Sequence, residues 1–122
     1  MATVDEVQKL FQAFGSGDMA TVTSLLSDDF TFELAGSSRF AGRTTGRNAV
    51  LALLGELMQT TGMENEVIGM YQAGDDVIVR QRGRAKDGYQ DESLLLISSR
   101  DGQITSMREF LFDVAAFDAF VG

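Results

Sequence analysis

The sequence predicts an α+β fold in which helices come first and a run of antiparallel strands follows. Apolar residues recur at helical spacing through most of the first sixty or so positions, with one strand-like stretch between them. After Gly62, turn signals recur every 13 to 14 residues, at AGDD (73–76), KDGY (86–89) and RDGQ (100–103). That spacing is typical of a meander of antiparallel hairpins.

The N-terminal half predicts two helices. The first carries an apolar stripe and ends at the GSGD segment, residues 15–18. Asp18 is a suitable N-cap for the second helix because its carboxylate can accept a hydrogen bond from an amide of the first turn. The two stripes are Val4, Val7, Leu10, Phe11 and Phe14, then Val22, Leu25 and Leu26.

The next segment, DDFTFELAG (28–36), alternates Phe30, Phe32 and Leu34 with polar residues and predicts a half-buried strand. A loop, SSRFAGRTTG (37–46), leads to a third helix from about Arg47. Four strands follow, and VAAFDAF (114–120) predicts a short closing helix.

Composition limits both the class of protein and its partners. A chain of 122 residues with 44% hydrophobic and 23% charged residues is typical of one globular domain, which we expect to span residues 1–122. A net charge of −8 argues against nucleic acid and anionic membranes as partners. The chain has no apolar run of 18 residues and no basic, apolar leader, so we expect a soluble, cytoplasmic protein.

The chain contains no Cys and no His, which excludes several kinds of chemistry. A thiolate nucleophile, a Ser–His–Asp triad and the usual zinc sites all need one of those residues. Neither a calcium loop nor a phosphate-binding loop is present, and we expect no metal and no cofactor. Acid–base catalysis would therefore depend on Asp, Glu, Tyr or Lys.

The two Asp-Gly turns predict how the strands pair, if each is a two-residue loop. Gln81 would then lie opposite Leu94, and Leu94 opposite Glu109. The residues predicted on this apolar face are Val77, Val79, Gln81, Glu92, Leu94, Leu96, Met107, Glu109 and Leu111. The opposite face would carry Ile78, Arg80, Arg82, Arg84, Asp91, Leu95, Arg108 and Phe110, with Arg84 paired to Asp91.

Because unpaired arginines are costly to bury, we expect the Arg-rich face to point to solvent or to a partner subunit. The apolar face would then meet the helices, and its polar residues would lie inside an apolar cone. A few polar groups in an apolar concavity are typical of a small-molecule pocket.

Several segments together resemble the SnoaL-like branch of the nuclear transport factor 2-like superfamily. These are GD (17–18) before the second helix, FAGRTTGRNAV (40–50) before the third, YQDES (89–93), RDGQI (100–104) and REFLFD (108–113). The resemblance covers essentially the whole chain. It implies a strongly curved mixed or antiparallel sheet wrapped around three helices, a cone-shaped cavity and a homodimer packed through the outer sheet face.

Two catalytic sets known from that superfamily match this chain incompletely. The catalytic base of ketosteroid isomerase corresponds to Leu34, which cannot move a proton. The Arg, Asp and Asp of limonene epoxide hydrolase correspond to Gln81, Gly83 and Glu109, so only Glu109 keeps a carboxylate.

We predict Glu109 and Glu92 as catalytic carboxylates that could divide the acid and base roles between them. Gln81 would position a ligand. The other predicted substrate-binding residues are apolar: Phe14, Phe32, Leu34, Leu57, Val79, Leu94 and Met107. A plainer reading makes Glu109 a solvated or ion-paired residue at the sheet rim, with Tyr89 packing beside its turn.

Three functions fit these features. The first is a cofactor-independent isomerase, cyclase or hydrolase that acts on an apolar carbonyl- or epoxide-bearing molecule. The second is a non-catalytic module that binds a small apolar ligand in the same cavity. The third is a structural dimerisation domain, which would need a filled cavity.

Overall fold

The computed structural model describes residues 1–122 as four helices and one six-stranded mixed sheet, which confirms the predicted α+β class. The helices are α1 (Val4–Ser16), α2 (Met19–Leu25), α3 (Arg47–Thr61) and α4 (Val114–Val121). The strands are β1 (Leu26–Leu34), β2 (Gly42–Thr45), β3 (Glu64–Ala73), β4 (Asp76–Arg84), β5 (Gln90–Arg100) and β6 (Gln103–Leu111).

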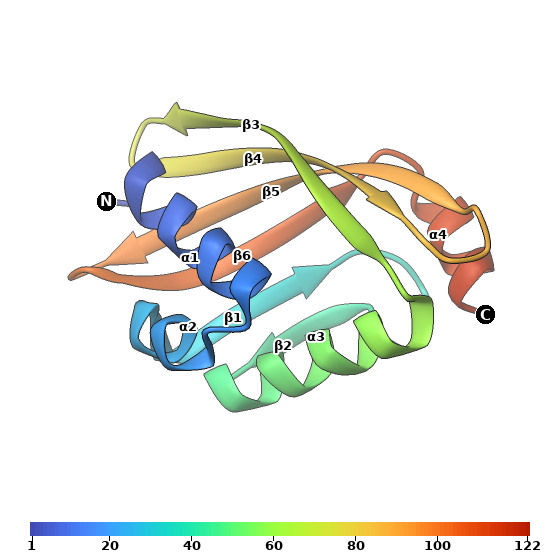
Figure 1. Cartoon of the computed structure of the whole chain (residues 1–122), viewed down its shortest axis with the longest axis horizontal. Helices are drawn as coiled ribbons and strands as arrows, with labels where there is room; N and C mark the ends of the chain where they lie inside the picture. The colour runs from blue at the N-terminus through green and yellow to red at the C-terminus, as the bar shows by residue number, and fades with distance from the viewer.

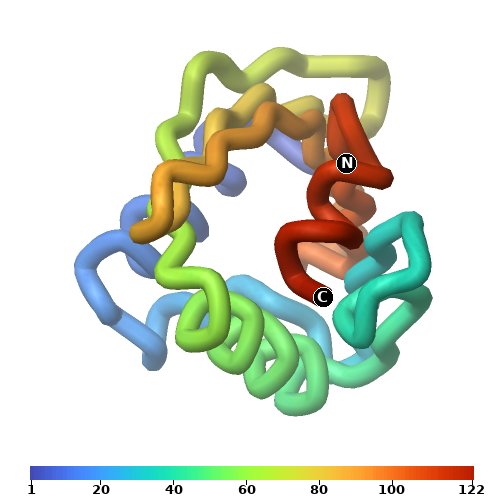
Figure 2. The backbone as a smooth tube through the Cα atoms, turned by 90° about the vertical axis from the view of Figure 1, so that its right-hand side faces the viewer, coloured from blue at the N-terminus to red at the C-terminus, as the bar shows by residue number.

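The sheet has the strand order β2-β1-β6-β5-β4-β3 and is not closed into a barrel (Figure 1). Its neighbours pair antiparallel except β1 and β6, which are parallel. Viewed from one end, α3 runs along one side of the chain, and α4 with the C-terminus lies toward the viewer (Figure 2). The predicted curved sheet is therefore present, and α1, α2 and α3 lie on its concave side (Figure 1).

The helix boundaries follow the predicted capping residues. Asp18 accepts a hydrogen bond from the Thr21 amide at 3.2 Å, which confirms it as the N-cap of α2. Gly17 ends α1 in the left-handed conformation (φ 73°), which glycine adopts without strain.

Strand β2 was missed, because Gly42–Thr45 falls inside the segment predicted as a loop. It pairs with β1, from Thr31 opposite Thr45 to Leu34 opposite Gly42. Four residues with a glycine and an arginine carry almost no strand propensity, so this strand forms through its pairing with β1.

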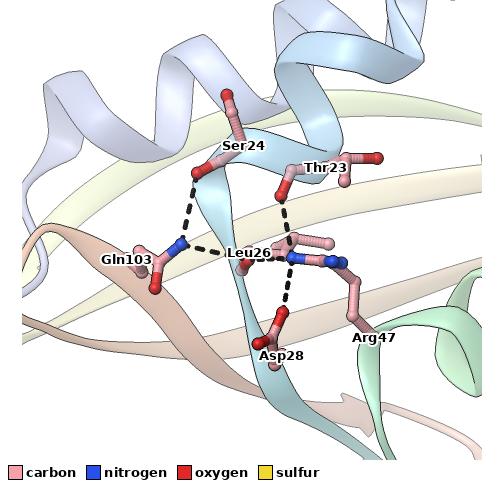
Figure 3. Close-up of polar contacts among 6 residues, drawn as sticks. All are labelled: Thr23, Ser24, Leu26, Asp28, Arg47 and Gln103. Carbon is pink, nitrogen blue, oxygen red and sulfur yellow. Dashed lines mark hydrogen bonds and ion pairs between the residues drawn. The ribbon is translucent and has the colours of Figure 1, made fainter.

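The junction between α2 and β1 is held by two side chains from distant parts of the chain (Figure 3). Arg47 Nη1 donates to the carbonyl oxygens of Thr23 and Leu26 at 3.3 and 3.1 Å and pairs with Asp28 at 3.1 Å. Gln103 Nε2 also donates to the Leu26 oxygen, at 3.4 Å. These bonds satisfy carbonyl groups at the C-terminal end of α2, where the helix itself supplies no amide donors.

The core lies between the helices and the concave face of the sheet. Its largest fully buried side chains include Phe30, Phe32, Phe40, Leu10, Leu26, Ile97 and Ile104. By contrast, α3 buries only Val50 and Thr61 completely, and its leucines are half-buried. The side chains of α1 and β1 are therefore more completely buried than those of α3.

The predicted register of β5 is wrong by one residue on both sides. The Ala85 amide bonds to the Tyr89 carbonyl at 2.8 Å, and Gly88 has φ 92°, so the β4–β5 loop has three residues, 86–88, and not two. The β5–β6 turn is the predicted two-residue loop, with positive φ at both Asp101 and Gly102. A bulge at Thr105 then shifts the pairing, so that Ser98 faces Ser106.

As a result, β4 and β6 present the predicted faces while β5 is inverted. Gln81 lies opposite Ser93, and Glu109 opposite Leu95. Arg84 lies opposite Gln90, so the predicted pair of Arg84 with Asp91 is wrong. In β5 the residues on the buried face are Asp91, Ser93, Leu95 and Ile97, while Glu92, Leu94 and Leu96 lie on the outer face.

Candidate functional site

Three neighbouring strands place polar side chains together on the concave face, toward the end where α4 lies. Gln81 comes from β4, Ser93 from β5 and Glu109 from β6. Gln81 Nε2 donates to Ser93 Oγ at 3.2 Å and lies 3.5 Å from Glu109 Oε2. Gln81 and Ser93 are buried, and Glu109 is half-buried. The prediction that Gln81 and Glu109 share the concave face is confirmed.

Glu109 has an unusual pKa for a carboxylate. Burial raises its pKa to about 6, and the negative charge of Asp91 acts in the same direction, while hydrogen bonds from Ser93 and Gln81 partly offset the increase. A carboxyl group with a pKa near neutrality can both accept and return a proton at cellular pH.

Asp91 is a second acid on the concave face, at the end of β5. It lies opposite Gly83 in the β4–β5 ladder. A Cβ at Gly83 would lie 2.5 Å from Asp91 Oδ1 and 2.8 Å from the Met63 sulfur. Burial raises the pKa of Asp91, and the nearby Tyr89 hydroxyl and Gly83 amide act in the opposite direction.

Tyr89 connects this cluster to α4. Its ring stacks on Phe120 of α4, with ring centroids 4.1 Å apart and planes within 4° of parallel. Its hydroxyl oxygen is buried and approaches Asp91, yet it has no hydrogen-bond partner of good geometry. Burial raises the pKa of the Tyr89 hydroxyl far above its usual value, and the charges of Asp91, Asp113 and Glu109 add to the effect.

A groove of about 420 Å³ opens beside these residues, between the β4–β5 hairpin and the start of α4. Glu109 does not line this groove but lies behind Tyr89 and Asp91. The lining residues are Arg82, Tyr89, Gln90, Asp91, Glu92, Phe112, Asp113 and Ala116. The groove therefore joins Asp91 of the concave face to Arg82 and Glu92 of the outer face.

Glu92 does not lie on the concave face, so its predicted place beside Glu109 is wrong. Its carboxylate accepts hydrogen bonds from Arg80 at 3.0 Å and Arg82 at 3.2 Å on the outer face. These two arginines hold the pKa of Glu92 below its usual value. An ion-paired carboxylate of low pKa is poorly suited to proton transfer near neutral pH.

One apolar prediction is also wrong. Leu94 lies on the outer face for the same reason as Glu92, since the three-residue loop inverts β5. Phe14 lies in the last turn of α1 and is 37% exposed, and its role in lining a cavity stays a prediction.

The remaining predicted binding residues line the interior. Phe32, Leu34, Val79 and Met107 belong to the buried core, and Leu57 packs half-buried against it from α3. Leu34 pairs with Glu109 across the parallel β1–β6 ladder. These side chains form the apolar surroundings of Glu109, and their role in binding a ligand stays a prediction.

Sequence reasoning missed Asp91 and Ser93 and gave Tyr89 only a packing role. One signal was available for Asp91. Gly83 interrupts a strand whose neighbours all carry side chains, and an interior strand glycine often marks the close approach of another group. That group is the Asp91 carboxylate.

The structure contains no group of three acidic side chains placed to hold a metal ion. None of its helices combines the length and apolar character needed to cross a membrane.

Proteins of similar sequence or structure align with nearly the whole chain. The uncharacterised protein Rv0034 of Mycobacterium tuberculosis is 26% identical over 132 aligned residues, which cover 98% of this chain and 95% of the relative. The solved structure of Bal32a, from a soil-derived mobile gene cassette, is 28% identical with a TM-score of 0.88 and covers 97% of this chain and 95% of its own. A protein of unknown function with a cystatin-like fold from Xanthomonas campestris is 26% identical with a TM-score of 0.84, covering 100% and 99%.

Two further solved structures share the fold at lower identity. TerC, co-crystallised with polyporic acid, has a TM-score of 0.80 at 18% identity and covers 97% of this chain and 96% of its own. A protein from Sinorhizobium meliloti that is provisionally assigned as a polyketide cyclase has a TM-score of 0.75 at 19% identity, covering 88% and 95%.

The family model described as a SnoaL-like domain matches residues 7–107, from Val7 in α1 to Met107 in β6. The chain belongs to the SnoaL-like domain family.

Proposed function

We propose that this protein binds a small apolar molecule and acts on it as a cofactor-independent isomerase, cyclase or hydrolase, with Glu109 as the group that moves the proton. The ligand would carry a carbonyl or an epoxide oxygen. The observation that carries the proposal is the Glu109 carboxylate, held beside the Gln81 amide at 3.5 Å with its pKa raised to about 6.

The roles of the residues follow from their chemistry. In its ionised form Glu109 can take a proton from a ligand carbon or from a water molecule. The Gln81 amide can hold the carboxylate in place or donate to a ligand oxygen as negative charge develops there. The apolar side chains around Glu109 exclude water, which strengthens both interactions. The likeness to TerC and to the Sinorhizobium protein, whose descriptions name a bound small molecule and a cyclase, supports this class of function.

A pH profile of Glu109→Gln tests the catalytic role. The parent and the variant would be assayed on a panel of apolar ketones, enones and epoxides between pH 5 and 9. We expect turnover by the parent to rise with an apparent pKa near 6, and turnover by the variant to fall by at least about a hundredfold. Glu33→Gln is a suitable control because Glu33 pairs with Arg43 and Arg108 away from the site. A Glu109→Gln protein as active as the parent would remove the catalytic assignment.

A second candidate is a non-catalytic module that binds the same kind of ligand. The observation that favours it is the position of Glu109 behind the groove and not on its wall. Ligand binding by both parent and Glu109→Gln, with no turnover across the panel, would identify this function.

We also propose that the chain forms a homodimer through the outer face of the sheet. Arg80, Arg82 and Glu92 form an ion-paired cluster there, and Phe110 is 45% exposed beside Arg108. Light scattering of the parent and of Phe110→Glu tests this, and a parent that is monomeric at high concentration would contradict it.

A further inference from the structure

The charges around the groove are not balanced. Arg82 is the one cationic residue in its lining, and its guanidinium is already paired with Glu92 at 3.2 Å. Two further cations lie nearby: Lys86 in the adjacent hairpin loop, with its methylene groups over Gly62, and Arg84 opposite Gln90 in the β4–β5 ladder. Neither lines the groove or forms an ion pair with one of its acids.

Three acids face the groove or its inner end without a cationic partner. Asp91 and Asp113 line the groove, and Glu109 lies behind them. No ion pair involves any of the three. Asp113 is engaged only as the N-cap of α4, where it accepts a hydrogen bond from the Ala116 amide at 3.0 Å. The charges of all three acids raise the pKa of the Tyr89 hydroxyl, which shows that they act at the same place.

The groove also has features that a ligand would use and that do not depend on charge. It has a volume of about 420 Å³ and apolar wall residues, Phe112 and Ala116, beside the Tyr89 ring. The Tyr89 hydroxyl oxygen itself is buried, so the groove wall is formed by other atoms of this residue.

We propose that this groove selects apolar ligands with a protonated amine head, accepts neutral alcohols or carbonyl compounds less well, and rejects carboxylates, phosphates and sulfonates. The proposal rests on the proposed function, because it names the class of ligand for that same site. The physical reason is the unbalanced negative charge of Asp91, Asp113 and Glu109, which acts in a partly desolvated groove where charges interact more strongly than in water.

Three probes of one shape test this without any need for turnover. These are 2-naphthylmethylamine, 2-naphthalenemethanol and 2-naphthoic acid, titrated at pH 7.5 and low salt and followed by NMR on the amides of Tyr89, Asp91 and Ala116. We expect the amine to bind at least about tenfold more tightly than the acid, with the alcohol between them and the difference reduced by added salt. Equal affinity of acid and amine, or the absence of shifts at these amides with all three probes, would overturn the proposal.

Asp113→Asn separates the local field from the overall charge of the protein. Asparagine is as good an N-cap as aspartate, so α4 should keep its cap while the groove loses one charge. We expect the preference for the amine over the acid to fall severalfold. Asp101→Asn is the matched control, because it removes one charge at the opposite end of β5 and asparagine tolerates the φ of 54° found there. An equal loss of preference in both variants would show that net charge alone is responsible, which would refute the groove as the origin.

The two proposals can fail separately. If the protein shows the charge preference but turns over no substrate, only the proposal of catalysis by Glu109 is contradicted. A protein whose turnover depends on Glu109 but which binds the acid as well as the amine would contradict only the selection by charge.

Discussion

The carboxylate of Asp91 occupies the space that a side chain at Gly83 would need. The two residues are partners in the β4–β5 ladder, and a Cβ at Gly83 would lie 2.5 Å from Asp91 Oδ1. A glycine on one strand thus determines where an acid on the next strand can lie, and this acid raises the pKa of Glu109.

Gly83→Ala should therefore destabilise the protein and displace Asp91. The new Cβ would meet Asp91 Oδ1 at 2.5 Å and the Met63 sulfur at 2.8 Å, and we expect a loss of about 1–3 kcal/mol in the free energy of unfolding. Gly55→Ala in α3 is the control, because no atom lies within 4 Å of its Cβ. That variant should gain about 0.5–1 kcal/mol from helix propensity. Urea denaturation measures both, and equal stability of the Gly83→Ala variant and the parent would contradict the close approach.

The Tyr89–Phe120 stack should contribute to holding α4 against the sheet. A double-mutant cycle with Tyr89→Ala and Phe120→Ala should give a coupling energy of about 0.5–1.5 kcal/mol. Tyr89→Phe keeps the stack and removes a hydroxyl that has no good partner, so its stability should equal or exceed that of the parent. A large loss in Tyr89→Phe would reveal a hydrogen bond that this structure lacks.

Glu109 should make the protein less stable as the pH rises from about 4.5 to about 6. Its folded-state pKa is raised from 4.5 to about 6, so in this range the folded state binds more protons than the unfolded state. The stabilisation from the bound proton is complete below pH 4.5 and is lost as the pH passes the folded pKa, by at most about 2 kcal/mol. The test is the difference in unfolding free energy between the parent and Glu109→Gln at several pH values. A difference that does not vary between pH 4.5 and 6 would be inconsistent with the raised pKa.

Asp118 should anchor the C-terminal helix to the segment before β2. Its carboxylate accepts hydrogen bonds from the Ser37 amide at 2.9 Å, the Ser38 amide at 3.3 Å and the Ser37 hydroxyl at 3.2 Å. Asp118→Ala should cost about 1–3 kcal/mol and speed amide exchange at both serines, and Asp118→Asn should lose less. Unchanged exchange at Ser37 and Ser38 in the alanine variant would argue against this anchor.

All the helices and every strand except β2 could be predicted from the sequence, in the right order, because each has a local signal. Asp18 shows this for α2, and the Asp101–Gly102 turn shows it for the β5–β6 hairpin. Strand β2 has no such signal, since it exists through its pairing with β1. The site was only half predictable. Gln81 and Glu109 depend on the faces of β4 and β6, which their apolar neighbours determine, whereas Asp91 and Ser93 depend on the register of β5.

The two hairpin turns agreed on the predicted register of β5, but their agreement was weak support for it because each pairing derived from them carried an error of one residue. Predicting a two-residue loop at 87–88, where the loop has the three residues 86–88, moved β5 by one position relative to β4. Overlooking the bulge at Thr105 moved β5 by one position relative to β6. The errors match, so the rows agreed with one another while every side chain of β5 was placed on the wrong face. Neither signal is strong locally, because Asp-Gly occurs in both two- and three-residue hairpin loops and a bulge has no fixed sequence.

The bulge at Thr105 has a consequence for how such a site can change. If the bulge were lost by re-pairing and the 86–88 loop tightened to two residues, with no residue deleted, β5 would present Glu92 to the interior and Asp91 to solvent. Deleting Thr105 itself would keep Leu95 opposite Glu109 and Asp91 on the interior face. The presence of the bulge, and not a gap alone, therefore decides which carboxylates of a related protein correspond to Asp91 and Glu109.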